Sequence, residues 1–226
     1  MAATKHHETT TAIEDYAKAI YTLEQRGEGA VSTNALADRL GVTPASASGM
    51  VRRLDEMGLV THVPYKGVQL TAEGTRLALE VLRHHRLLEL YLAESLGVPW
   101  DRVHAEAEVL EHVLSEELEE AIATKLGNPT RDPHGDPIPS ADLRIDERET
   151  VALQTLDSGQ AGTFVRVSDS DSAILRYLSE RGISPGDRFE VIDKQPFGGP
   201  VFARFGTDVH VLGGGLARAM RVEAEG

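Results

Sequence analysis

The first third of the chain combines short helical patterns with glycine turns. In residues 12–26 apolar positions recur at helical spacing and glycines follow directly, which predicts a helix. A second helix is expected before the tight turn at Gly41, and Thr43 can cap a third helix that ends at Gly58. The stretches "LVTHV" and "VQLT", separated by a turn, then predict a small hairpin.

Two short helices around a glycine turn, followed by a hairpin, are typical of a winged helix-turn-helix. The helix after Thr43 exposes small polar residues at its start, where base edges would lie, and arginines farther along, where phosphates would lie. The hairpin tip adds side chains suited to a backbone or minor-groove contact. We therefore predict DNA contacts by Thr33, Thr43, Pro44, Ala45, Ser46, Ser48, Gly49, Arg52, Arg53, Tyr65 and Lys66.

The alternative for this region is a small helical bundle without a DNA role. The predicted recognition helix carries no large amide that could read adenine. Its specificity would therefore rest on methyl contacts and on DNA shape.

The middle of the chain predicts two longer helices. Residues 72–96 are amphipathic at helical spacing until "GVPW" interrupts them, and Asp101 can cap a next helix that runs to about Lys125. At about 100° per residue, four potential ligands share an arc of roughly 100° on that helix. They are His104, Glu108, Glu111 and His112. A different arc forms an apolar stripe for packing, made of Val109, Leu110, Val113 and Leu114.

These four polar side chains favour a metal site over a solvated charged face, because no lysine stands among them to compensate the charge at i,i+4. On the preceding helix His85 and Glu89 stand at i,i+4 and can chelate one ion together. Glu14 and Asp15 lie on the first helix, where an acidic residue could complete a site. Carboxylate and imidazole ligands without sulfur favour Mn(II) or Fe(II), with Zn(II) and Co(II) as possible binders.

After the helices the pattern changes. The stretch "GNPTRDPHGDPIPSADL" predicts a loop or domain boundary. We interpret its "DPHGDP" as turn chemistry, because it lacks the alternating acidic ligands and the closing glutamate of a calcium-binding EF-hand. From Leu153 on, short alternating stretches with one helical segment between them predict a small SH3-like β-barrel. Its phenylalanines are scattered, so we expect a structural or modulatory role rather than peptide binding.

The predicted architecture is therefore an α+β multidomain chain. We place a winged helix-turn-helix domain at 1–72, a helical metal-binding and dimerisation domain at 73–146, and a linker with the barrel at 147–226.

Composition narrows the function. The chain of 226 residues has a formal net charge of −13, which argues against general nucleic-acid binding, so DNA contact must come from a local patch. It has no cysteine and therefore no disulfide or thiolate metal site. No apolar run approaches the roughly 20 residues of a membrane helix, and the first residues lack the apolar core of a signal peptide. A cytoplasmic protein is the simplest interpretation.

The order of winged helix, ligand-bearing helix pair, proline-rich linker and barrel resembles the diphtheria toxin repressor family of metal-dependent transcriptional regulators. The most specific motifs are "EDYAKAIYTLE", "RHHRLLE" and "VHAEAEVLEH". Within that family the chain looks most like the manganese-responsive branch, the manganese transport regulators. Iron-responsive members typically have methionine at the position of Asp15 and cysteine at that of Glu108, whereas both are carboxylates here.

The resemblance implies two metal sites. The primary, regulatory site would consist of Asp15, Glu108, Glu111 and His112. The second site would consist of His85, Glu89, His104 and, from the barrel, Asp171, with Asp169 as the other barrel candidate. The glutamine that usually follows three residues after the barrel ligand is Ile174 here. Where the short manganese regulators without a barrel carry another acidic residue on the first helix, this chain has Lys18.

The resemblance further implies a homodimer built through residues 72–126, with two recognition helices in successive major grooves of a palindromic operator. An ion between the DNA-binding domain and the dimer core would hold these helices at operator spacing. We therefore expect a manganese-activated repressor of metal-uptake genes and no enzyme.

Three alternatives stay open. The first is an iron-dependent repressor of the same architecture. The second is a metal-independent winged-helix regulator whose acidic helix is a solvated face. The third is a metallohydrolase that uses the His/Glu cluster to activate water, although no nucleophile motif or substrate pocket accompanies that cluster.

Overall fold

A computed structural model describes residues 10–27, 29–63, 65–168 and 171–225. The chain divides into two compact units. The first holds the chain up to His84 together with Glu111–Val113 and Pro139–Arg144, and the second holds His85–Leu110, Leu114–Ile138 and the chain from Ile145 on. Among the described residues, no helix has the length and apolar character needed to cross a membrane.

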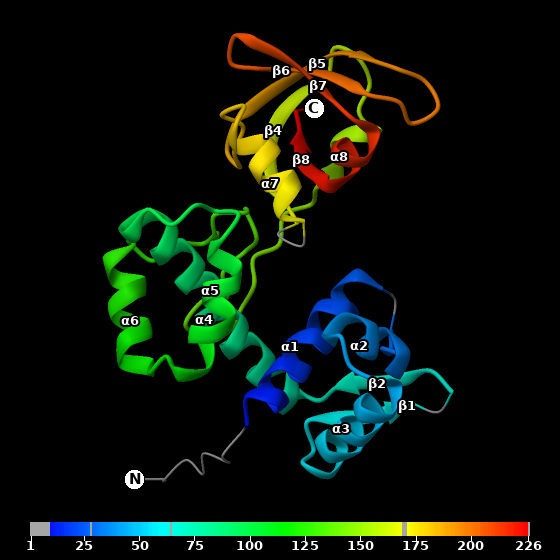
Figure 1. Ribbon diagram of the computed structural model, residues 1–226, viewed down its shortest axis with the longest axis vertical. Coiled ribbons are helices and arrows are strands. Elements are labelled where there is room, and N and C mark those ends of the chain that lie inside the picture. Colours follow the sequence, from blue (N-terminus) through cyan, green and yellow to red (C-terminus); the bar gives the residue numbers. More distant parts are fainter. Residues whose placement is uncertain (1–9, 28, 64, 169–170, 226) are drawn as a thin grey trace. The chain divides into compact units, whose positions relative to one another are not determined.

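The first unit contains the predicted winged helix-turn-helix (Figure 1). Its elements are α1 (Thr11–Arg26), α2 (Thr33–Leu40), α3 (Pro44–Glu56), β1 (Val60–Val63) and β2 (Gly67–Leu70). Residues such as Ile13, Ile20, Leu36, Leu54 and Val68 form its core and are fully buried. The two strands pair antiparallel, and Val31 adds a bridge to Val68.

Two glycines are required by this geometry. Gly41 has φ 65° and ends α2 in the left-handed region, which L residues with a side chain rarely adopt. A Cβ on Gly67 would lie 1.9 Å from the carbonyl oxygen of Val31, so the close approach of the hairpin to the loop before α2 excludes any side chain there.

The helical region begins with α4 (Ala72–Leu96), which has the bounds of the predicted amphipathic segment. The single helix expected up to Lys125 is wrong. The structure has instead α5 (Val103–Leu110), a 3-10 turn η1 (Glu111–Val113) and α6 (Glu116–Lys125). Ser115 starts the new helix, since its Oγ accepts the N–H of Leu118 at 3.3 Å. The tighter 3-10 turn changes the angular phase, so residues after Leu110 no longer share the helical face of those before it.

The predicted apolar stripe is largely exposed within the single chain. Within the chain, Leu114 packs against the helical core, which includes Leu87, Leu88, Leu90, Ala107 and Ile122. Val109 and Val113 are instead 71% and 77% exposed, and Leu110 is 38% exposed.

The C-terminal barrel is confirmed. Its elements are β3 (Val151–Ala152), η2 (Leu153–Thr155), β4 (Ala161–Val167), α7 (Ser172–Ser179), β5 (Arg188–Lys194), β6 (Val201–Phe205), β7 (Asp208–Leu212), α8 (Gly214–Ala219) and β8 (Met220–Ala224). The strands form one antiparallel sheet in the order β3-β8-β4-β5-β6-β7. Irregular register in β4 and β5 bends the sheet around Phe164, Leu175, Leu178 and Met220.

The short helix α8 lies beside α7 in Figure 1 and was not predicted. Its sequence "GGLARA" begins with two glycines, which are typical of turns. It forms here because buried Ala217 belongs to the barrel core, a tertiary contact that local propensity does not encode.

Candidate functional site

Side chains with metal-binding atoms meet where α1 contacts the 3-10 turn η1. Ligand atoms of Asp15, Glu111 and His112 all lie within 4.8 Å of one another. Nε2 of His112 is 3.1 Å from Oδ1 of Asp15 and 3.4 Å from Oε1 of Glu111. The side chain of Glu111 is fully buried, whereas that of Asp15 is 33% exposed. This group, called the η1 cluster below, presents two carboxylates and an imidazole to a common point, a donor set that fits a divalent ion.

Glu14 holds the imidazole of His112 from its other side. The Oε2 atom of Glu14 lies 2.6 Å from Nδ1 of His112. With Nδ1–H donating to this carboxylate, the lone pair of Nε2 faces Asp15 and Glu111. A carboxylate behind a ligating histidine fixes the tautomer and orientation of the ring. Glu14 and Asp15 are neighbours in sequence. Because they contact different nitrogens of His112, Glu14 is interpreted as a positioning group and Asp15 as a candidate ligand.

A second group is centred on Glu89 of α4. Its Oε1 lies 3.0 Å from Nε2 of His85 and 3.1 Å from Nδ1 of His104. Glu89 is 1% exposed, so imidazoles rather than water surround its carboxylate. Glu108 belongs to the same neighbourhood, since its Oε1 lies 3.9 Å from Nδ1 of His85 and 3.7 Å from Nε2 of His104.

The loop after α6 adds two ligands that the sequence did not indicate. Asp132 and His134 lie with Glu89 in a group whose ligand atoms are within 4.8 Å. Nδ1 of His134 is 3.6 Å from Oε2 of Glu89 and has no hydrogen-bond partner among the described residues, although the residue is fully buried. The other nitrogen, Nε2, contacts the carbonyl oxygen of Trp100 at 2.8 Å. An orphaned buried imidazole nitrogen beside a carboxylate fits a metal ligand.

The interpretation of "DPHGDP" as turn chemistry is therefore incomplete. Oδ1 of Asp132 does form a turn, since it accepts the N–H groups of His134 and Asp136 at 2.9 Å each. The same loop also brings two buried side chains with potential metal-binding atoms to Glu89. The available signal was a histidine within a loop otherwise made of Asp, Pro and Gly. We call Glu89, His85, His104, Asp132 and His134 the Glu89 cluster.

The Glu89 cluster shifts the pKa of its own members. Burial raises the pKa of Asp132 to about 8, and the negative charges of Asp136 and Glu89 act in the same direction. Burial opposes the charged form of His134, but the Glu89 carboxylate outweighs it and raises the pKa of that imidazole to about 9. Burial likewise opposes the charge of Glu89, yet His104, His134 and His85 hold the pKa of its carboxyl well below the usual value. An ionised buried carboxylate surrounded by imidazoles fits a divalent cation.

The structure divides the residues predicted as metal ligands. It brings Asp15, Glu111 and His112 together, and it places Glu108 beside His85 and His104. The regular helix predicted through Glu108 and Glu111 is interrupted, because α5 ends at Leu110 and the 3-10 turn begins at Glu111.

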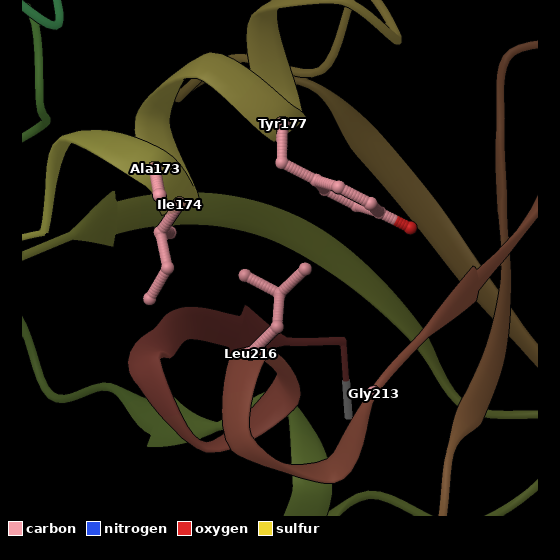
Figure 2. A pocket seen from close by; sticks show the side chains of 5 residues that line it. All are labelled: Ala173, Ile174, Tyr177, Gly213 and Leu216. Atoms are coloured by element: carbon pink, nitrogen blue, oxygen red, sulfur yellow. The ribbon is translucent and has the colours of Figure 1, made fainter.

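The barrel candidates lie in other surroundings. Asp171 is exposed and caps α7, since its Oδ1 accepts the N–H of Ala173 at 2.9 Å. Asp169 lies outside the described residues. Ile174 points toward Leu216 in the apolar pocket of Figure 2, which is lined by Ala173, Ile174, Tyr177, Gly213 and Leu216. This pocket offers no carboxylate or imidazole and therefore no metal chemistry.

The predicted DNA contacts lie largely on exposed surface. In α3, Ala47, Val51 and Leu54 are buried, and the opposite face exposes Pro44, Ala45, Ser46, Ser48, Gly49, Arg52 and Arg53. The hydroxyls at the start of α3 have local partners, because Thr43 and Ser46 share a hydrogen bond of 2.9 Å and Ser48 donates to the carbonyl of Pro44.

The hairpin tip and α2 complete this surface. Tyr65 is fully exposed with φ 61°, and Lys66 beside it is exposed. Thr33, at the first position of α2, is half-buried.

Comparison with known families gives three matches. Residues 8–68 match the N-terminal DNA-binding domain of the iron-dependent repressors, and residues 71–140 match their metal-binding and dimerisation domain. Residues 151–224 match the FeoA domain.

Relatives that match over nearly the whole chain belong to the same family. The iron-dependent repressor IdeR of Mycobacterium tuberculosis (strain ATCC 25618 / H37Rv) is 32% identical over 229 residues, which cover 96% of this chain and 99% of that protein. The diphtheria toxin repressor of Corynebacterium efficiens is 35% identical over 222 residues, covering 93% and 94%. The chain belongs to the iron-dependent repressor family, which includes the diphtheria toxin repressors.

Two solved structures of metal-dependent regulators are also similar to this repressor. A manganese-dependent transcriptional repressor in complex with manganese has a TM-score of 0.86 and 42% identity, covering 94% of this chain and all of that one. The manganese regulator SloR has a TM-score of 0.75 and 30% identity, covering 94% and 98%.

The repressor is therefore a metal-dependent transcriptional regulator and not an enzyme. All its predicted DNA contacts lie within the DNA-binding region 8–68, which also contains Asp15. The partners Glu111 and His112 lie in the metal-binding and dimerisation region 71–140, as do the members of the Glu89 cluster. The η1 cluster thus joins the two regions through side-chain contacts.

Proposed function

We propose that Mn(II) activates this repressor, that the active form is a homodimer on a palindromic operator, and that its targets are genes of metal-ion uptake. The observation that carries the proposal is the η1 cluster, in which Asp15 supplies a carboxylate beside Glu111 and His112. Carboxylate-rich sites without sulfur are relatively well suited to manganese. Two similar solved structures are described as a manganese-dependent repressor and a manganese regulator, which supports the same metal.

Regulation would follow from where the ligands stand. Asp15 lies on α1 of the DNA-binding region, whereas Glu111 and His112 lie on η1 of the metal-binding region. A divalent ion bound by all three would fix α1 against η1. The ion would neutralise the like charges of the two carboxylates at this junction and thereby bias a two-state element. The ion also cancels negative charge on an acidic protein that must approach DNA.

The fourth ligand of the regulatory site remains a proposal. The family resemblance assigns Glu108 to this site, and its carboxylate lies beside His85 and His104 in the structure. For the second site we propose His85, Glu89 and His104, extended by Asp132 and His134 of the loop. Asp171 would join through the barrel, although its carboxylate already caps α7.

Exposed apolar side chains support the proposed dimer through residues 72–126. Val109 and Leu118 are 71% and 52% exposed on consecutive helices of the second unit. Exposed apolar side chains of this size are typical of protein interfaces. We also propose the domain division at 1–72, 73–146 and 147–226.

Iron is the second candidate metal, because the similar curated relatives are described as iron-dependent repressors. Imidazole and carboxylate ligands bind Fe(II) as well as Mn(II), so selectivity must be measured.

The test is operator selection followed by DNA binding across a free-metal series. Mn(II), anaerobic Fe(II) and chelator are compared side by side. Tight binding with Mn(II) at concentrations where Fe(II) fails supports a manganese sensor. Equal or better activation by Fe(II) assigns the repressor to iron homeostasis, and DNA binding that chelator leaves unchanged contradicts metal regulation altogether.

A further inference from the structure

Lys18 places a positive charge inside the η1 cluster. Its Nζ lies 2.5 Å from Oε1 of Glu111, a residue 93 positions away in sequence. The side chain of Glu111 is fully buried and that of Lys18 is 14% exposed. Such an ion pair differs from one at the surface, because the buried carboxylate of Glu111 has no water to replace the ammonium when it is removed.

The contact uses the oxygen that faces the other ligands. Oε1 of Glu111 is the atom that lies 3.4 Å from Nε2 of His112. A divalent ion between Asp15, Glu111 and His112 needs that same oxygen or must coexist with an ammonium beside it. Two cations a few ångströms apart in a partly buried site repel each other strongly.

The side chain of Lys18 can yield its place. It carries a compact ammonium on a flexible four-carbon stem, which can move to water without changing α1. Glu111 cannot do the same, since it is fully buried on η1. The Glu111 carboxylate would therefore bind the Lys18 ammonium in the metal-free form and the divalent ion in the metal-bound form.

We propose that Lys18 is an internal counter-ion that divalent metal must displace from Glu111, and that it thereby sets the metal concentration at which the repressor responds. This inference rests on the proposed regulatory role of the η1 cluster. In the metal-free protein the ammonium satisfies a buried carboxylate, and on metal binding it is released. Lys18 raises the threshold for activation without being a ligand.

The test compares Lys18→Gln and Lys18→Met with the wild-type repressor. Both variants remove the charge, and Lys18→Met also keeps most of the apolar stem, which guards against loss of packing. Lys125→Gln is the matched control, because it removes an exposed lysine of α6 and changes the net charge equally. Lys18→Arg keeps the charge.

The first readout is Mn(II) binding followed by electron paramagnetic resonance of the free ion. Removing the charge should tighten binding at the η1 cluster by about tenfold or more, since a unit charge within a few ångströms no longer opposes the ion. Lys125→Gln should bind as wild type does, and Lys18→Arg should bind no tighter. Unchanged or weaker binding by both neutral variants, or tighter binding by Lys18→Arg, would overturn the proposal.

The second readout is thermal unfolding with and without Mn(II). The neutral variants should melt at a lower temperature than wild type when metal-free, because the buried Glu111 carboxylate loses the ammonium of Lys18, and Mn(II) should remove most of that difference. If the melting temperature of the neutral variants stays equally far below that of wild type with Mn(II), metal does not displace Lys18, and Lys18 has only a structural role.

Asp15→Ala, measured in parallel, distinguishes a failure of the proposed regulatory site from a failure of the Lys18 proposal alone. If it leaves Mn(II) binding and metal-dependent DNA binding intact, the proposed regulatory site is wrong, and the Lys18 proposal falls with it. If it abolishes them while neither neutral variant tightens binding, the regulatory site stands and the Lys18 proposal alone fails.

Discussion

The η1 cluster and the Glu89 cluster use the same kinds of ligand in different surroundings. In the η1 cluster, α1 and η1 are brought together across 98 positions of sequence, and Lys18 supplies a cation of its own. In the Glu89 cluster, His85 and Glu89 stand on one helix, and three imidazoles surround a buried carboxylate.

The Glu89 cluster is also connected to the barrel. The carbonyl of His134 accepts the N–H of Val167 at 3.0 Å, and Arg166 pairs with Asp136 at 3.3 Å. A Cβ on Gly135 would lie 1.9 Å from the carbonyl oxygen of Val165, so loop and strand are in close contact. We propose that the two clusters divide these roles: the η1 cluster switches DNA binding, and the Glu89 cluster stabilises the arrangement of loop and barrel.

The strongest test of this division is Asp15→Ala. It removes a ligand that joins the DNA-binding region to η1, so Mn(II)-dependent operator affinity should fall at least about 100-fold, beyond the loss typical of an outer-shell change. Fluorescence anisotropy of labelled operator measures the effect, and circular dichroism should show an intact fold. Asp38→Ala, an exposed acidic residue of α2, is the control. Wild-type operator affinity of Asp15→Ala at wild-type metal concentrations would contradict the assignment.

The next test concerns Glu108, which lies between His104 and Glu111 in sequence. The family resemblance places Glu108 in the regulatory site, so Glu108→Ala should abolish metal-dependent operator binding as Asp15→Ala does. His104→Ala is the comparison, because His104 contacts both Glu89 and Glu108. We expect His104→Ala to weaken metal-dependent operator binding less than Asp15→Ala does. If operator titrations show the same smaller loss for Glu108→Ala, Glu108 belongs with the Glu89 cluster.

A smaller effect is expected from Glu14→Gln. The carboxylate at 2.6 Å from Nδ1 of His112 orients the ring without offering a ligand to the ion. Its replacement should weaken Mn(II) binding by about 10-fold, the lower range for an outer-shell partner, and should leave the number of bound ions unchanged. Isothermal titration calorimetry measures both quantities. Loss of one bound ion would mean that Glu14 is itself a ligand.

A separate test concerns the pH dependence of metal affinity at the Glu89 cluster. With the pKa of Asp132 at about 8 and that of His134 at about 9, both groups are mainly protonated at neutral pH in the metal-free protein. Each must lose its proton to bind an ion, so affinity at this cluster should rise between pH 7 and 9, by up to about tenfold per pH unit for each proton released. Metal titrations at several pH values, compared with His134→Ala, measure it. An affinity that falls over this range would contradict ligation by these two groups.

Much of the fold follows from local patterns. Helical spacing and capping residues predicted α1, α2, α3 and α4, and alternating stretches predicted β4 to β8. These features depend on periods of 3.6 and 2 residues, which neighbouring side chains express directly. The residue types also determined the metal chemistry, since a chain without cysteine can offer only carboxylate and imidazole as strong ligands.

The tertiary structure decided which ligands meet. Helical phase put Glu108 and Glu111 on one arc, whereas α5 ends at Leu110 and the 3-10 turn begins at Glu111. Nothing local pairs Lys18 with Glu111 or brings His134 to Glu89, because such contacts depend on how distant segments pack. The sequence by itself determined the elements and the kinds of ligand, whereas the packing of α1 on η1 and the return of the loop to α4 determined which candidate ligands gather in the two clusters.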